Sequence, residues 1–238
     1  MSALSYNGHD FSSYVTAELV EPAGHALEPR ALAVPGRPGA VLLGSELPPR
    51  PLKVRLFLDA GVSLSAERRS EARHALYGWL IAPNGGELRL SGEPGLVWRD
   101  AVVTGVTDWD SLFEDGSCEV EFTCYDPVAY GDERSSAEGS FIVGGTWETW
   151  PVIRLTATAG SSLRVADELG RYVLVERAFY AGDEVLMDFA AEAVTVNGAD
   201  AAADVAVEST FFPLAPGAHA LAFAGCAAHT VTWAERWL

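Results

Sequence analysis

The chain has 238 residues, 49% of them hydrophobic, which is enough for one large domain or two of ordinary size. Its 33 acidic residues outnumber its 16 basic ones, and the formal net charge of -17 argues against tight binding to nucleic acid, because such binding requires cations that neutralise phosphates. No run of about 20 apolar residues occurs, so no membrane insertion is expected. The start, MSALSYNGHDF, lacks the basic and apolar regions of a secretory signal, and three cysteines do not form a disulfide framework. We expect reduced, buried thiols and synthesis in a reducing cytoplasm.

The first distinctive segment, residues 33–43, reads AVPGRPGAVLL and places two apolar runs on either side of a turn. Proline fixes φ and glycine is free to adopt positive φ, so this segment predicts a sharp, stiff hairpin. Such a tip suits either a tight turn within a domain or an arm that reaches another molecule.

A strand and a helix follow. Residues 52–58 alternate apolar and charged side chains, which predicts a half-buried strand, and the prolines before it are expected to lie outside a central ladder. The apolar spacing then changes to three and four, which predicts one α-helix near residues 65–82 with Ser65 as its N-cap. Residues 83–86, PNGG, end it. Its apolar stripe is expected to pack against a sheet.

The remaining sequence is rich in strand patterns. They cover 87–90, 96–106 and 118–125, and after residue 140 they cover 150–158, 171–177, 183–189, 193–198, 219–225 and 229–238. Residues 131–140, GDERSSAEGS, read as an exposed linker or long surface loop. The expected fold is mainly β, with two β-sandwich-type domains at 1–137 and 138–238, the first carrying the packed helix.

No catalytic, cofactor-binding or metal-binding motif is visible. The five histidines, His9, His25, His74, His219 and His229, lack the spacing of metal ligands. Residues 108–116, DWDSLFEDG, alternate oxygen ligands as a calcium loop does, but they lack its central glycine and terminal glutamate, which favours an acidic hairpin tip. We therefore expect no metal, no cofactor and no enzymatic activity.

The order of the motifs resembles that of the distal tail proteins of phages with long, non-contractile tails. In the first half these motifs are YNGHDFSSYVTAEL, VPGRPGAVLLG, PPRPLKVRLFLD, ALYGWL, ELRLSGEPGLVWRDAVVTGV and VEFTCYDPVAYG. The second half is similar to the galectin-like C-terminal domain of that family, through WPVIRLTATAG, LVERAFYAGDEVLMDF, VTVNG, FFPLAPGAHALAFAG and TVTWAERWL. The resemblance covers nearly the whole chain and depends on the order of several motifs.

The resemblance implies a structural protein of the virion at the tip of the tail. Members of the family form a ring, typically a hexamer, which joins the tail tube protein to the tail-tip hub and often to the receptor-binding apparatus. DNA passes through the lumen of this ring without specific binding, and carboxylates are expected to line it. The hairpin Val34, Pro35, Gly36, Arg37, Pro38, Gly39, Ala40, Val41 and Leu42 is then expected to be an arm that adds to the sheet of the neighbouring subunit.

Two alternatives remain open in the sequence. The first is a carbohydrate-binding module, because the tryptophans Trp147, Trp150, Trp233 and Trp237 could stack on sugars, although core or interface positions are favoured for them. Against it, the galectin H-x-N-x-R strand is missing, and WAERW at 233–237 departs from the galectin W-x-x-E-x-R pattern. The second is a glycan-active enzyme whose carboxylates meet only in the folded chain.

Overall fold

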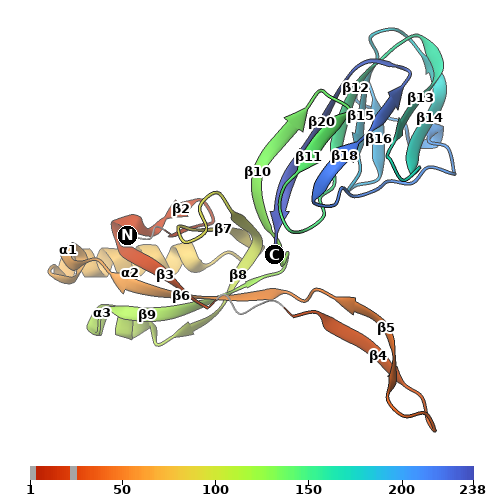
Figure 1. Cartoon of the computed structure of the whole chain (residues 1–238). Helices are drawn as coiled ribbons and strands as arrows, with labels where there is room; N and C mark the ends of the chain where they lie inside the picture. The colour runs from red at the N-terminus through yellow and green to blue at the C-terminus, as the bar shows by residue number, and fades with distance from the viewer. Residues whose placement is uncertain (1–3, 22–25) are drawn as a thin grey trace. The chain divides into compact units, whose positions relative to one another are not determined.

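Antiparallel strands make up most of the part of the chain that the structure describes, residues 4–21 and 26–238 (Figure 1). In this computed structural model the chain divides into two units, the first ending at Tyr130 and the second running from Gly131 to Trp237. The expectation of a mainly β fold with a packed helix in the first half is confirmed.

Unit 1 is built on one antiparallel sheet in the order β3-β6-β9-β8-β7-β1-β2. Its strands are β1 (Leu4–Tyr6), β2 (His9–Asp10), β3 (Val15–Glu21), β6 (Arg50–Leu58), β7 (Gly86–Leu90), β8 (Val97–Thr107) and β9 (Ser117–Cys124). A short 3-10 helix, η1 (Phe11–Ser13), joins β2 to β3. The alternation expected for 52–58 is present: Leu52, Val54 and Leu56 are buried, because successive side chains of a strand point to opposite faces.

Helix α2 (Ala66–Leu80) packs its apolar stripe on unit 1, as the 3–4 spacing predicts. Ala72, Leu76 and Leu80 are buried, while Trp79 is partly buried and stacks on the ring of His9, with 5.0 Å between centroids. The hydroxyl of Ser65 accepts a hydrogen bond from the backbone N–H of Arg68 at 3.3 Å, so the expected N-cap is also confirmed.

Three details of unit 1 differ from the expectations. Residues 108–116 were expected to form an acidic hairpin tip, but they form a short helix, α3 (Trp109–Glu114), because Leu112 and Phe113 bury themselves in the unit. A further short helix, α1 (Ala60–Ser63), precedes α2. Pro51 lies within the central strand β6, opposite Thr123 of β9. It is tolerated there because, among the described residues, β3 pairs with β6 only as far as Lys53.

Unit 2 is a β-sandwich. One sheet has the order β17-β16-β15-β12-β20-β10, and the other is β14-β13-β19, with β11 and β18 forming a separate pair. The strands are β10 (Ala129–Ser136), β11 (Ser140–Val143), β12 (Val152–Ala157), β13 (Gly160–Ala166), β14 (Tyr172–Phe179), β15 (Glu184–Asp188), β16 (Ala193–Val196), β17 (Ala199–Asp200), β18 (Gly217–Ala220), β19 (Ala222–Ala224) and β20 (Cys226–Trp237). A 3-10 helix, η2 (Ala202–Asp204), follows β17. Ile153, Leu163 and Val231 share one core between the sheets.

The expected linker at 131–140 is instead regular structure. Residues 131–136 belong to β10, which lies next to β20 in the sheet order, and Arg134 forms an ion pair with Glu235 at 3.6 Å. The segment looked like a linker because it is polar. In the structure residues 132–135 of β10 are exposed to water, so this part of the strand needs no apolar side chains. The division between the units therefore lies at 130/131, whereas the sequence placed it at 137/138.

Candidate assembly surfaces

The hairpin at 33–43 is the tip of an arm formed by β4 (Glu28–Ala33) and β5 (Ala40–Glu46). In the sequence, the arm is inserted between the paired strands β3 and β6 of unit 1. Within the described residues its two strands pair only with each other, and Figure 1 shows them as a separate ribbon in orange. An isolated two-stranded hairpin has marginal stability in water, so this element needs a further surface.

The tip has the rigid geometry that its prolines and glycines predict. The carbonyl of Val34 accepts a hydrogen bond from the backbone N–H of Arg37 at 3.1 Å, and Gly36 has φ +82°. With Pro35 at the second position and glycine at the third, this is a type II β-turn. Gly39 also has a positive φ, +78°, immediately before β5. The hairpin prediction is confirmed, whereas the contact of Val34–Leu42 with a neighbouring subunit stays a prediction.

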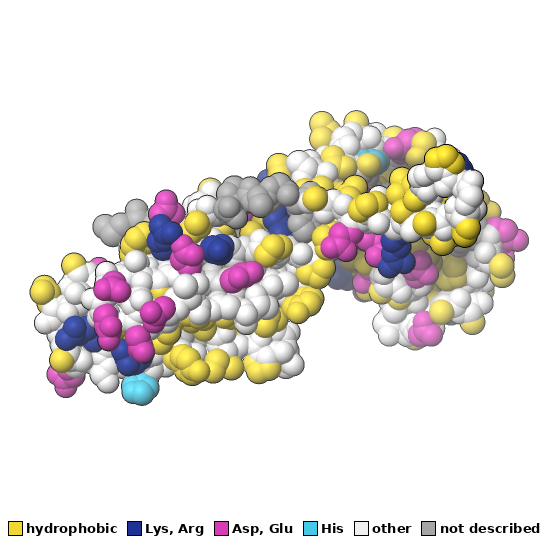
Figure 2. Space-filling view, turned by 90° about the horizontal axis from the view of Figure 1, so that it is seen from below, with side chains coloured by type: hydrophobic (Ala, Val, Ile, Leu, Met, Phe, Trp, Pro, Cys, Tyr) yellow, Lys and Arg dark blue, Asp and Glu magenta, His cyan; other side chains and the backbone are white. Residues whose placement is uncertain are grey.

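The arm carries apolar side chains on both faces, and both faces are open to water. Residues directly opposite each other in an antiparallel pair share a face, so Leu32 and Val41 lie on one face, and Ala31 and Leu42 lie on the other. Leu32 is 54% exposed and Leu42 is 63% exposed. Figure 2 shows hydrophobic side chains gathered along this ribbon. Exposed apolar surface of this kind is typical of an interaction site.

The base of the arm is polar. Arg30 forms an ion pair with Glu46 at 2.6 Å, and both side chains are more than half exposed. A pair this exposed contributes little to stability. The exposed apolar side chains lie farther along the arm, toward its tip.

Unit 1 also has an apolar groove of about 340 Å³ on the side of α2. We call it the α2–β8 groove; its lining comes from the end of α2 and the residues after it, from β8 and from α3, namely Tyr77, Leu80, Ile81, Ala82, Pro83, Val102, Val103, Val106 and Trp109. Tyr77 and Ile81 are more than half exposed. Figure 2 shows hydrophobic side chains gathered beside α2. Nothing in the sequence marked this groove in advance, because its walls come from three elements separated along the chain.

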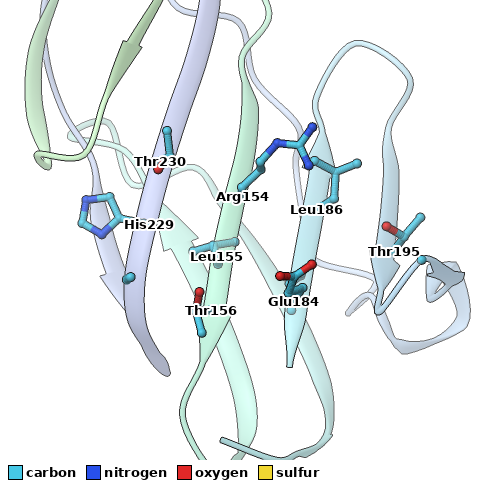
Figure 3. Close-up of a pocket in the computed structure, with 11 residues that line it drawn as sticks. Arg154, Leu155, Thr156, Glu184, Leu186, Thr195, His229 and Thr230 are labelled. Atoms are coloured by element: carbon cyan, nitrogen blue, oxygen red, sulfur yellow. The ribbon is translucent and has the colours of Figure 1, made fainter. Parts of the chain in front are cut away.

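Unit 2 has a polar groove of about 370 Å³ on the open face of the sheet formed by β16, β15, β12 and β20 (Figure 3). Arg154 lies opposite Leu186 on β15 and opposite Thr230 on β20. Figure 3 shows the guanidinium of Arg154 extending toward Leu186, with Glu184 further along β15. The lining residues include no tryptophan or tyrosine, so this face lacks the aromatic platform on which sugar rings stack.

The histidines do not come together. His9 stacks on Trp79, His74 lies on α2, and His229 stacks on Phe223 with 3.8 Å between centroids. His219 lies within hydrogen-bond distance of both the carboxylate of Glu168 and the carbonyl of Ala215 in unit 2, a contact that we call the His219 clasp. His25 is outside the described residues. Across 4–21 and 26–238, no group of three or more His, Cys, Asp or Glu side chains is arranged to hold a metal ion.

The expectation of buried thiols is confirmed for two of the three cysteines. Cys118 and Cys124 are buried, and burial raises the pKa of each thiol to about 12. Cys226 is partly buried, and burial raises its pKa as well.

Trp233 is buried in the core of unit 2, and Trp150 packs against that core. In the described part of the chain, no helix has the length and apolar character needed to cross a membrane.

Comparison with known proteins identifies related domains over both units. The family model described as "Phage tail protein RIFT-related domain" matches residues 6–124, and the family model described as "Siphovirus-type tail component, C-terminal domain" matches residues 144–237. No curated protein matches the chain by sequence.

Solved structures share the fold along the full length. The SPP1 Dit (gp 19.1) protein, described as a paradigm of the hub adsorption apparatus in phages that infect Gram-positive bacteria, superposes with a TM-score of 0.82 at 20% identity, covering 100% of both chains. A chain of the phage P2 baseplate, in its activated conformation with calcium, superposes with a TM-score of 0.53 at 8% identity, covering 99% of this chain and 98% of that one.

Proposed function

Because the chain belongs to the siphovirus-type phage tail proteins, a family of structural components at the tip of the virion's tail, we propose that it forms a closed ring, a hexamer, that joins the tail tube to the tail-tip hub. Unit 1 makes the ring, and unit 2, a galectin-like sandwich, offers docking sites to the hub or to the receptor-binding apparatus. The protein acts by its geometry and catalyses no reaction.

The arm is the observation that supports the ring. The arm is a strand ribbon with apolar side chains on both faces, and in the described part of the chain its strands pair only with each other. The stiff tip limits the entropy lost when the arm docks, because its backbone is already ordered. Contact of this arm with the next subunit gives a head-to-tail interface, which closes into a ring when the rotation between subunits closes.

The acidity of the chain fits a ring through which DNA passes. A net charge of -17 per subunit makes electrostatic adhesion of phosphate backbone unfavourable. We propose that part of this charge faces the lumen, so that the genome slides without being held. A ring whose lumen proved neutral or basic would contradict this part of the proposal.

The two alternative functions have weaker support. The polar groove of unit 2 lacks tryptophan and tyrosine in its lining, which disfavours a carbohydrate-binding role for it. Trp150 and Trp233 contribute to the core of unit 2, so packing accounts for these two rings. An enzyme would require a cleft with catalytic side chains, and the two grooves described above are an apolar one and an open sheet face.

Deleting residues 35–39 tests the role of the arm. The full chain is expected to sediment as a closed oligomer, and the deletion variant as a monomer with both units folded, since the tip lies outside both cores. Analytical ultracentrifugation gives the mass, and circular dichroism gives the fold. A deletion variant that still formed a closed ring would contradict the proposed role of the arm.

A further inference from the structure

We infer that the α2–β8 groove of unit 1 is the receptor for the arm of the adjacent copy, with the apolar tip of the arm seated against Tyr77, Ile81, Val103, Val106 and Trp109. The inference rests on the proposed ring, and it adds the surface to which the arm binds. It therefore assigns the two halves of the repeating interface to different parts of unit 1.

The two surfaces match in polarity. Val34, Leu42 and Leu43 are exposed on the arm, and Leu42 and Leu43 are each more than 60% exposed. On the groove side Tyr77 and Ile81 are 60% and 56% exposed. Two open apolar surfaces on one chain that do not cover each other are covered when a second copy supplies the missing half.

The two surfaces also match in charge. Arg37 is the one charged residue between Ala33 and Leu43, and it lies in the turn at the tip. The α3 segment that supplies Trp109 to the groove, residues 108–115, carries four carboxylates and no cation. Arg73 of α2 neutralises part of this charge, through an ion pair with Asp110 at 3.3 Å. The acidity that remains favours the approach of a tip that carries a single arginine.

The dimensions suit a hairpin tip. The six residues of β4 extend about 20 Å at about 3.4 Å per residue, so the tip reaches well beyond the sheet that carries it. The groove, at about 340 Å³, is of the size that holds a small group of side chains, while the rest of the ribbon lies outside it. Its open shape admits a rigid tip from one side without opening the core of the unit.

Complementary variants test this assignment in the full chain. The arm variant carries Leu42→Asp and Leu43→Asp, and the groove variant carries Ile81→Asp and Val106→Asp; all four side chains are exposed, so the changes spare the core. A control carries Tyr180→Asp and Val207→Asp, which replace apolar residues of unit 2 that are at least as exposed. Each Asp is expected to weaken association about 10- to 100-fold, so the arm variant and the groove variant are monomers while the control remains a ring.

An equimolar mixture of the two variants gives the decisive result. One partner still has an intact arm and the other an intact groove, so the mixture should form dimers that cannot extend further. A mixture that stays monomeric overturns the inference. A groove variant that still forms rings also overturns it, while leaving the proposed function intact if the arm variant is a monomer. A wild-type chain that is itself a monomer removes the proposed function and the inference together.

Engineered disulfides give a second readout that does not require dissociation. Leu42→Cys is combined in turn with Tyr77→Cys, Ile81→Cys or Val106→Cys, and the oxidised protein is analysed on a denaturing gel. At least one pair is expected to give a ladder of covalent multimers, because a disulfide forms only between closely placed residues. Leu42→Cys with Thr195→Cys, on the polar face of unit 2, is the matched control. The absence of a ladder from all three pairs contradicts the inference.

Discussion

The imidazole of His219 lies 3.1 Å from the carboxylate of Glu168, Nδ1 to Oε1, and its Nε2 lies 2.6 Å from the carbonyl of Ala215. The other oxygen of Glu168 accepts a hydrogen bond from the backbone N–H of Ala220 at 3.2 Å. These contacts tie the turn at 167–170 to β18, although the two are far apart in the sequence.

The His219 clasp predicts a loss of stability in acid. Burial alone would raise the pKa of Glu168, but the hydrogen bonds from its own backbone and from Ala220, together with His219, outweigh burial and lower it. A carboxyl whose pKa is lower in the folded state stabilises the fold above its unfolded pKa, and this contribution is lost as the pH falls through the folded pKa.

Thermal unfolding of Glu168→Gln and of the wild type at several pH values measures how much Glu168 stabilises the fold. We expect a loss of about 0.5–1.5 kcal/mol at pH 7, the net contribution of a hydrogen bond, and a smaller difference at pH 3. The exposed Glu208→Gln serves as the control. If the difference in stability between wild type and Glu168→Gln grew as the pH fell, Glu168 would stabilise the fold through its protonated carboxyl, which would contradict this prediction.

The packing of α2 predicts a large effect at Leu76. This side chain is fully buried, and Leu76→Ala removes its contacts and leaves a cavity, which should lower the free energy of unfolding of unit 1 by about 2–5 kcal/mol. Leu64→Ala, at a side chain that is 90% exposed just before α2, should change it by less than about 0.5 kcal/mol. Chemical denaturation measures both. Equal effects would mean that α2 is not fixed to the sheet through its apolar stripe.

The cysteines should differ in reactivity. The thiolate is the reactive form, and the pKa of about 12 for Cys118 and Cys124 leaves almost none of it at a pH of about 8. Alkylation followed by mass spectrometry should therefore label these two only after unfolding, with Cys226, the less buried thiol, labelled first in the native protein. Rapid labelling of Cys118 in the native protein would contradict the packing of β9.

The type II turn predicts a cost at Gly36. An L side chain is strained at φ +82°, so Gly36→Ala should disfavour the tip by about 1 kcal/mol and weaken association while leaving both units folded. Gly44, also in the arm, has no positive φ, and no atom lies within 4 Å of the position that a Cβ would take, so Gly44→Ala should preserve the turn. Sedimentation of the two variants measures the difference; equal association would show that the turn geometry is unimportant.

The boundary between the units predicts the behaviour of two fragments. A fragment of residues 131–238 keeps the part of β10 that lies beside β20, including Arg134, whereas a fragment of 138–238 leaves that edge of β20 without it. The longer fragment should therefore have the higher melting temperature. Identical melting temperatures would place the boundary at 137/138, where the sequence alone put it.

The sequence predicts elements whose signals are local. The N-cap Ser65, the stripe of Leu76 and Leu80, and the Pro35-Gly36 turn are all decided by neighbouring residues, and the structure confirms them. Features that depend on pairing were missed: β10 was read as a linker because its partner β20 lies about a hundred residues later.

The same distinction between local signals and contacts made on folding applies to the two candidate assembly surfaces. The tip at 34–42 was found because its chemistry is written in one continuous segment, and the α2–β8 groove was missed because α2, β8 and Trp109 meet only in the folded unit. Residues 219–225 show the same limit: they look like one strand, but they divide into β18 and β19, which pair with different partners, β11 and β13.

Negative-stain electron microscopy of the purified full chain, with native mass spectrometry of the same sample, tests the ring most directly. We expect a closed particle of six copies around a central opening. Single copies at every concentration, or an open chain of copies that never closes, would contradict the account.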